Sequence, residues 1–187
     1  MKHEAAVSAL EAGLLVGLPT DTVYGIAADP WSEAGVKALH DLKGRSPGHP
    51  IALLAADAGQ VSELCVVTAP ARLLAERFWP GPLTIVLEAA DRVPSWIGDR
   101  DRRTVGLRVP QHPVALDLLK TVGALAVTSA NPTGRDPALN DRQAAAMFGE
   151  TVAAYLPGEG GTGVASTVVD VTVDPPRVLR PGPVVIE

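Results

Sequence analysis

Short apolar runs alternate along the chain with segments in which apolar residues recur every three or four positions. Runs and strict alternation are typical of strands, whereas the longer period is typical of helices. Strands are therefore expected over residues 14–18, 51–55, 83–87, 104–109, 124–128 and 167–173, with a final extended segment over 178–186. Helices are expected over residues 32–42, 68–78, 113–120 and 141–148.

Glycine and proline mark the joints between these elements. Ser32 is suited to cap the helix that follows it, and Trp79-Pro80-Gly81-Pro82 ends the next one. Alternating strands and helices predict an α/β fold, and some connections are too short for a crossover helix, so the sheet should be mixed. No repeat or long linker divides the chain, so we expect a single domain over residues 1–187.

Composition narrows the class of protein. The 187 residues are 47% hydrophobic and 4% aromatic, as in an ordinary globular protein with an aliphatic core. The net charge of -5 argues against nucleic-acid binding by bulk electrostatics, although it does not exclude a local basic cleft. No secretory signal pattern and no apolar run of about 18 residues occurs, so a cytoplasmic protein is expected.

Several familiar motifs are absent or misleading. Cys65 is the only cysteine and has apolar neighbours, which predicts a buried, unreactive side chain. Residues 158–163 match the dinucleotide pattern literally, but they precede a strand late in the chain, so a flexible loop is expected instead. No Walker phosphate loop occurs. The four histidines lack metal-ligand spacing, so no protein-bound metal is expected.

Lys43 and Arg45 lie where a predicted helix gives way to Ser46-Pro47-Gly48-His49-Pro50. Residues two apart share a side of extended backbone, and Pro47 biases Ser46 towards extension. The two cations could therefore converge on one anion. The alternative is a solvated, positively charged helix end, which the helix dipole also favours.

The clearest alternation is Thr104-Val105-Gly106-Leu107-Arg108-Val109. The three apolar residues claim the core face, so Thr104, Gly106 and Arg108 should share the other face. An arginine beside a glycine suits the close approach of a carboxylate or phosphate to the strand. An outward, solvated arginine is the alternative.

Ser129 and Asn131 follow an apolar strand and point the same way in extended backbone, so both could bond a ligand. A polar strand end that begins a turn is the alternative. Ser129 does not lie in the G-x-S-x-G pattern of many hydrolases, so a catalytic triad is not expected.

Taken in order, these stretches resemble the YrdC/TsaC family of threonylcarbamoyl-AMP synthases in its short form. The matching segments are Pro19-Thr20-Asp21-Thr22-Val23-Tyr24-Gly25, Lys43-x-Arg45, Trp79-Pro80-Gly81-Pro82-Leu83-Thr84, Ser129-Ala130-Asn131, Ser166-Thr167-Val168-Val169-Asp170 and Arg180-Pro181-Gly182. The resemblance covers essentially the whole chain. It implies a twisted mixed sheet with flanking helices around a concave, positively charged cavity.

The resemblance also implies a reaction and roles. ATP, L-threonine and bicarbonate would give threonylcarbamoyl-AMP and pyrophosphate, with Mg²⁺ bridging the phosphates, for the threonylcarbamoyl modification of tRNA by a partner transferase. The threonine-binding residues would be Thr22, Arg108 and Ser166. The ATP-binding residues would be Arg45, His49, Thr104, Ser129, Asn131 and Arg180, with Lys43 and Arg45 catalytic.

Two departures from the family pattern fall in one segment: Ser46 precedes Pro47, where proline often follows the arginine directly, and His49 stands where asparagine or lysine is common. The alternatives to this function are a catalytically inactive or RNA-binding relative, including one that binds tRNA or double-stranded RNA, and an enzyme that uses the same scaffold on carbamoyl phosphate.

Overall fold

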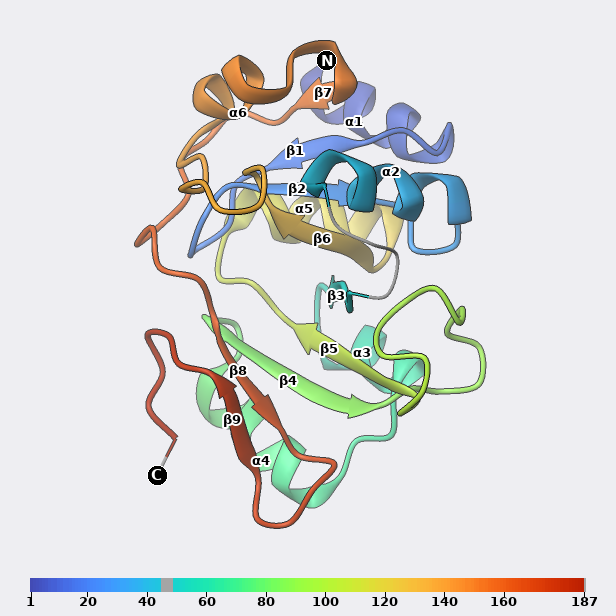
Figure 1. Ribbon diagram of the computed structural model, residues 1–187, viewed down its shortest axis with the longest axis vertical. Coiled ribbons are helices and arrows are strands. Elements are labelled where there is room, and N and C mark those ends of the chain that lie inside the picture. The colour runs from blue at the N-terminus through green and yellow to red at the C-terminus, as the bar shows by residue number, and fades with distance from the viewer. Residues whose placement is uncertain (45–48, 187) are drawn as a thin grey trace.

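A computed structural model describes residues 1–44 and 49–186 of the chain. Its helices and strands alternate through most of the sequence (Figure 1). The helices are α1 (Lys2–Glu11), α2 (Glu33–Lys43), α3 (Ala58–Leu64), α4 (Ala69–Phe78), α5 (Pro113–Val122), α6 (Asp141–Phe148) and the 3-10 turn η1 (Gly149–Thr151). The strands are β1 (Val16–Leu18), β2 (Gly25–Ala28), β3 (Ala52–Leu54), β4 (Leu83–Glu88), β5 (Thr104–Arg108), β6 (Leu125–Ser129), β7 (Ala154–Tyr155), β8 (Thr167–Asp170) and β9 (Arg177–Arg180).

Within the described residues the strands form one mixed sheet in the order β7-β1-β2-β6-β3-β5-β4-β8-β9. Parallel pairs such as β3 with β5 and β4 with β8 lie beside antiparallel pairs such as β2 with β6. The predicted α/β fold with a mixed sheet is therefore confirmed. None of the helices in the described part of the chain is long and apolar enough to cross a membrane.

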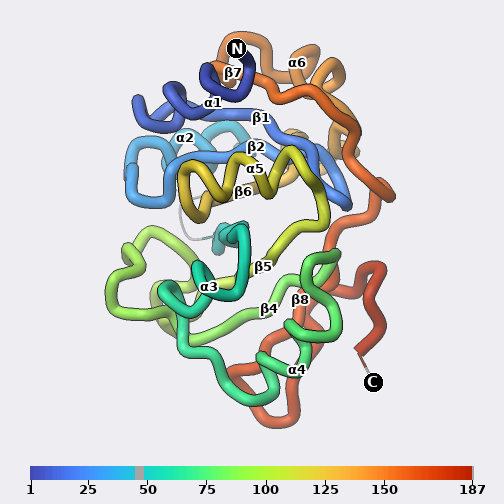
Figure 2. The backbone as a smooth tube through the Cα atoms, turned by 180° about the vertical axis from the view of Figure 1, so that it is seen from behind, coloured from blue at the N-terminus to red at the C-terminus, as the bar shows by residue number. Residues whose placement is uncertain are grey.

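Helices cover both faces of the sheet. Helix α2 lies on the face seen in Figure 1, whereas α1, α3, α4 and α5 lie on the face seen from behind in Figure 2. Leu118 and Leu119 of α5 pack in one apolar cluster with Ala27 of β2. Val36 and Leu39 of α2 pack in a second apolar cluster with Ile26, the residue of β2 that precedes Ala27. Successive residues of a strand point to opposite faces of the sheet, so β2 contributes side chains to both apolar clusters.

The ends of α2 follow directly from the sequence. Ser32 caps the helix, because its Oγ accepts a hydrogen bond from the Gly35 amide at 3.1 Å. Gly44 ends it with a φ of 62° and ψ of 34°, a left-handed conformation that glycine adopts without steric cost. Lys43 is therefore the last residue of the helix, held at a fixed point against the sheet.

Besides the short turn η1, four elements were not expected: α1, α3, β2 and β7. The buried side of α1 is built mainly from alanine, and β2 reads Gly-Ile-Ala-Ala, so neither carries a strong apolar period. Strand β7 has only two residues. For α3, a signal was available, because Asp57 caps the helix by accepting a bond from the Gln60 amide.

The glycine-rich stretch 158–163 differs from the expected flexible loop. Its backbone packs directly on the segment that follows β1, where the Gly161 amide donates to Thr20 O at 2.9 Å and the Gly163 amide donates to Thr22 O at 2.8 Å. A Cβ on Gly161 would lie 2.0 Å from the Asp21 carbonyl oxygen. The glycines are thus needed for close backbone contact and not for a phosphate turn.

Candidate active site

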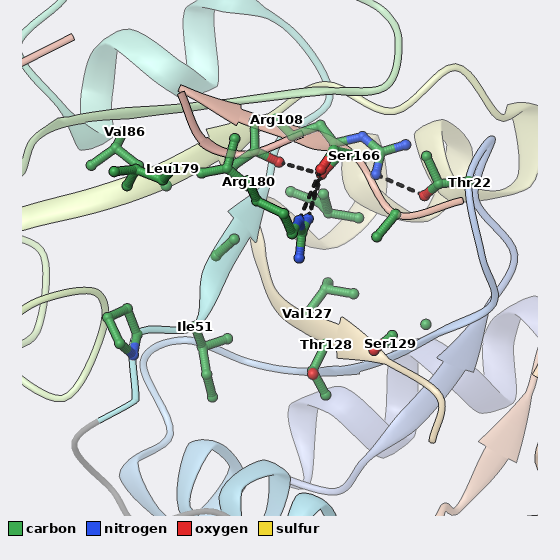
Figure 3. Close-up of a pocket in the computed structure, with 18 of the residues that line it drawn as sticks. Thr22, Ile51, Val86, Arg108, Val127, Thr128, Ser129, Ser166, Leu179 and Arg180 are labelled. Atoms are coloured by element: carbon green, nitrogen blue, oxygen red, sulfur yellow. Dashed lines mark hydrogen bonds between the residues drawn. The ribbon is translucent and has the colours of Figure 1, made fainter. Parts of the chain in front are cut away.

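A concave cavity of about 350 Å³ opens on the sheet, a volume in the usual range for a small-molecule site. Its walls come from β2, β3, β4, β5, β6, β8 and β9 and from the segment between β1 and β2 (Figure 3). Gly25 and Gly106 contribute bare backbone to the lining. The polar residues in this lining include Thr20, Thr22, Thr84, Asp99, Arg102, Thr104, Arg108, Thr128, Ser129, Ser166 and Arg180.

Arg108 is a buried cation of the site. It lies on the cavity face of β5 with Thr104 and Gly106, while Val105 and Leu107 are buried in the core, so the predicted division of faces is confirmed. The side chain is not solvated: Arg108 is 5% exposed. Its Nε donates to Gly81 O at 3.0 Å, Nη1 to Thr22 Oγ1 at 2.9 Å and Nη2 to Asp21 Oδ1 at 2.6 Å.

Electrostatics around Arg108 suit an anionic ligand. Burial lowers the pKa of Arg108, the Asp21 carboxylate opposes that change, and nearby Arg180 lowers the pKa further. An arginine in a protein still stays protonated at ordinary pH. Three of its five N–H groups are bonded to described residues, which leaves two for a ligand. That number matches the two oxygens of a carboxylate.

Ser166 lines the cavity within a second group of polar side chains (Figure 3). Its Oγ is 2.8 Å from Thr84 Oγ1, and Arg180 Nη2 donates to it at 3.1 Å. Arg180 also donates to the Ser166 carbonyl oxygen from Nε at 3.0 Å and from Nη2 at 2.8 Å. Arg180, although on an exposed edge strand, is thereby fixed with its guanidinium at the cavity wall.

Lys43 connects two of the sequence motifs. Its Nζ donates to Ser129 O at 2.9 Å, to Ser129 Oγ at 3.2 Å and to Asn131 Oδ1 at 2.7 Å. Lys43 is 3% exposed, which excludes a solvated helix end. Ser129 lines the cavity, whereas Lys43 and Asn131 are not among the described residues that line it. Arg45, the second cation of the pair, and Ser46 lie outside the described residues.

Thr104 and His49 are the remaining described residues assigned to ATP. Thr104 lines the cavity and is buried. His49 is exposed and is not among the described lining residues, although its neighbour Pro50 is. No group of three His, Cys, Asp or Glu side chains that could hold a metal ion is found in residues 1–44 and 49–186.

Cys65 takes no part in this site. It is 5% exposed and its Sγ donates to Val61 O at 3.2 Å. Burial raises the pKa of the Cys65 thiol to about 12, so the nucleophilic thiolate is not formed near neutral pH.

The side chains at the site that were not singled out from the sequence include Thr20, Asp21 and Thr84. Asp21 holds Arg108 and also accepts from the Gln111 amide at 2.8 Å, while its Oδ2 has no hydrogen-bond partner in the described structure. Asp21 and Arg108 are 87 residues apart, so no local pattern could pair them. Thr20 and Thr84 do lie in motifs quoted for the family resemblance, which is the one signal that could have found them.

Comparison with known proteins places this geometry in a family. A domain model for Sua5, YciO and YrdC, described as telomere recombination, matches residues 8–182. The chain belongs to the Sua5/YciO/YrdC family. A Mycobacterium tuberculosis protein, provisionally named a threonylcarbamoyl-AMP synthase, is 45% identical over 98% of this chain and 85% of its own length. A Pyrococcus abyssi protein named threonylcarbamoyl-AMP synthase is 38% identical over 100% of this chain but only 55% of its own length.

Solved structures of the family agree with the fold. Pyrococcus abyssi Sua5 complexed with L-threonine matches with a TM-score of 0.91 and 36% identity, over 96% of this chain and 54% of that one. Escherichia coli YciO matches with a TM-score of 0.88 and 25% identity, over 97% and 89% of the two chains. This Sua5/YciO/YrdC chain thus spans about half the length of the Pyrococcus protein and most of YciO.

Proposed function

We propose that this chain is a threonylcarbamoyl-AMP synthase, a nucleotidyltransferase that converts ATP, L-threonine and bicarbonate into threonylcarbamoyl-AMP and pyrophosphate. The observation that carries the proposal is the buried Arg108 fork, with two N–H groups left for a carboxylate in a cavity that also holds Arg180 and several hydroxyl groups. Relatives that bear this enzyme's name, and a relative solved with L-threonine, support the choice of substrate.

In this proposal the threonine carboxylate binds Arg108, between Thr22 and Ser166. The threonine amine attacks the carbon of bicarbonate, forming an N–C bond while one C–O bond breaks. That oxygen leaves as water with a proton from the amine, and an N-carboxylate remains. An oxygen of that group then attacks the α-phosphorus of ATP. The new O–P bond replaces the bond to the β-phosphate, and pyrophosphate leaves. Both reactants are anions, so cations that neutralise the developing charge supply much of the rate.

Lys43 and Arg45 are the proposed catalytic cations, and ATP is proposed to enter as its magnesium complex. All three N–H donors of Lys43 have acceptors at Ser129 and Asn131, so a phosphate oxygen must replace at least one of them. Arg180, Thr104, Ser129, Asn131 and His49 are the proposed remaining contacts to ATP. Contact between Lys43 and the charged phosphate would then break one of the hydrogen bonds from Lys43 to Ser129, the last residue of β6, or to Asn131.

We assign the activity to one domain over residues 1–187, because a single sheet supplies the cavity walls. The product would be the substrate of a transferase that modifies tRNA. We also propose that the chain itself contacts tRNA or double-stranded RNA. The site of action is proposed to be the cytoplasm.

The test is a reaction containing the chain, MgATP, L-threonine and ¹³C-bicarbonate, followed by mass spectrometry. Threonylcarbamoyl-AMP that carries one ¹³C, formed together with pyrophosphate, is the expected product. Omission of threonine should abolish both. Absence of the adduct and of threonine-dependent pyrophosphate release, with a folded chain, would refute the proposal and favour an inactive or RNA-binding relative.

A further inference from the structure

The hydroxyl groups of Thr20 and Thr22 form a chain whose proton directions can be worked out. Both side chains line the cavity, and the residues are only 3% and 2% exposed. Thr20 Oγ1 lies 2.7 Å from the Val23 carbonyl oxygen and 3.0 Å from Thr22 Oγ1. A carbonyl oxygen can only accept, so the single hydroxyl proton of Thr20 points to Val23.

The direction at Thr22 follows from its two neighbours. Thr20 has no second proton to give, so the Thr22 hydroxyl is the donor in their mutual bond. The two acceptor sites of Thr20 Oγ1 are then taken by the Thr22 hydroxyl and by the Thr22 amide at 3.2 Å. On its other side, Thr22 Oγ1 accepts from Arg108 Nη1 at 2.9 Å, because a guanidinium can only donate.

Thr22 Oγ1 is therefore left with one lone pair and no proton for a ligand. It cannot donate to a carboxylate oxygen, but it can accept from an N–H or O–H group. Backbone hydrogen bonds also fix this segment, since the Gly161 amide donates to the Thr20 carbonyl oxygen and the Gly163 amide donates to the Thr22 carbonyl oxygen. The hydroxyl direction is thus built into the fold before any ligand arrives.

The pair Thr84 and Ser166 has the opposite capacity. Arg180 occupies one acceptor site of Ser166 Oγ, and one of the two hydroxyl protons lies between Thr84 and Ser166. Whichever residue donates in that bond, the pair keeps one O–H donor and two acceptor sites for the cavity. A ligand hydroxyl can both donate to this pair and accept from it, whereas Thr22 can only accept from such a hydroxyl.

Given the proposed function, on which this inference rests, we infer that Thr20 is a positioning residue that makes Thr22 the acceptor for the substrate's α-amino group. The amino group of an α-amino acid is attached next to the carboxylate, and Thr22 is bonded to Arg108, the proposed carboxylate ligand. Thr22 then orients the nitrogen that forms the new N–C bond. The side-chain hydroxyl of threonine is read by Thr84 and Ser166.

Calorimetry with three ligands tests this assignment. L-Threonine has both groups, L-2-aminobutyrate lacks the side-chain hydroxyl, and (R)-3-hydroxybutanoate lacks the amine. In Thr20→Val the Thr22 proton can turn toward the cavity and meet the substrate N–H, so affinity for the two amino acids should fall about three- to tenfold, the size of one buried hydrogen bond. The relative affinity for hydroxybutanoate should stay within about twofold. Thr20→Ser keeps the hydroxyl and should restore amino-acid binding.

Each other outcome overturns a stated part. Weaker binding of threonine and hydroxybutanoate, with aminobutyrate unchanged, would assign Thr22 to the side-chain hydroxyl. Equal losses for all three ligands, or no rescue by Thr20→Ser in a variant that unfolds at the wild-type urea midpoint, would make Thr20 merely structural. A folded wild-type chain that binds neither amino acid would refute the proposed function and this inference with it, whereas normal wild-type binding with the wrong variant pattern refutes the inference alone.

Discussion

Replacing Arg108 by lysine tests the proposed carboxylate site with little disturbance of the charge balance. Arg108→Ala would leave the Asp21 carboxylate without its cation, and loss of one partner of a buried ion pair costs about 3 to 5 kcal/mol of folding stability. Lysine keeps the positive charge beside Asp21 but loses the planar fork. The variant therefore separates ligand recognition from folding.

The expected magnitude follows from the bonds that lysine cannot replace. A lysine ammonium has three N–H donors, and the protein acceptors at Gly81, Thr22 and Asp21 already number three. The paired contact to the substrate carboxylate is lost, and hydrogen bonds to charged groups contribute about 1.5 to 3 kcal/mol. Threonine affinity should therefore fall by about 10- to 150-fold.

Isothermal titration calorimetry measures this effect with L-threonine and, separately, with MgATP. ATP affinity should change by less than about threefold, because Arg108 is assigned to the amino acid. Arg92→Lys is a matched control, since Arg92 forms an exposed ion pair with Glu63. Equal losses for threonine and ATP, or unchanged threonine affinity in a folded Arg108→Lys variant, would refute the assignment.

Three further predictions use other parts of the site. Lys43→Ala or Arg45→Ala should lower adenylate formation by about 100-fold, the usual effect of removing one preorganised transition-state donor, in a pyrophosphate-release assay; near-wild-type rates would reject their catalytic role. With threonine, serine and valine in competition, valine should be rejected by about 10,000-fold and serine by only about 1 to 3 kcal/mol, as ranked by mass spectrometry of the acyl-adenylates; equal use of valine and serine would show that the hydroxyl is not read. For Asp170, burial acts to raise the pKa, but hydrogen bonds from Thr172 and Arg102 and the charge of Arg102 lower it overall. A carboxyl group whose pKa is lowered in the folded state stabilises the fold at pH values above the ordinary carboxyl pKa, and this stabilisation is lost as the pH falls. Asp170→Asn should therefore lower the urea midpoint at pH 7 and lower it much less near pH 2, a pattern that the exposed control Asp174→Asn should not show. A difference in urea midpoint between wild type and Asp170→Asn that stays constant with pH would contradict this linkage.

Local patterns determined much of the framework. The alternation over residues 104–109 correctly divided β5 into a core face and a cavity face, because successive strand residues must point to opposite sides. Ser32 and the proline-rich run after Phe78 correctly marked the start of α2 and the end of α4. The family resemblance, which depends on the order of short motifs, identified the family and the activity of its named members.

Only the tertiary structure decided which polar groups meet and in what state. The sequence left Lys43 and Arg108 open between solvated and ligand-binding positions, and their burial follows from packing against segments more than 80 residues away. Asp21 meets Arg108, and Thr84 meets Ser166, across similar separations. Local periodicity reports which side of an element is apolar, but hydrogen-bond direction depends on distant partners that can only donate or only accept. The sequence therefore determined the residue types of the site, and the fold decided which of their protons and lone pairs remain for a substrate.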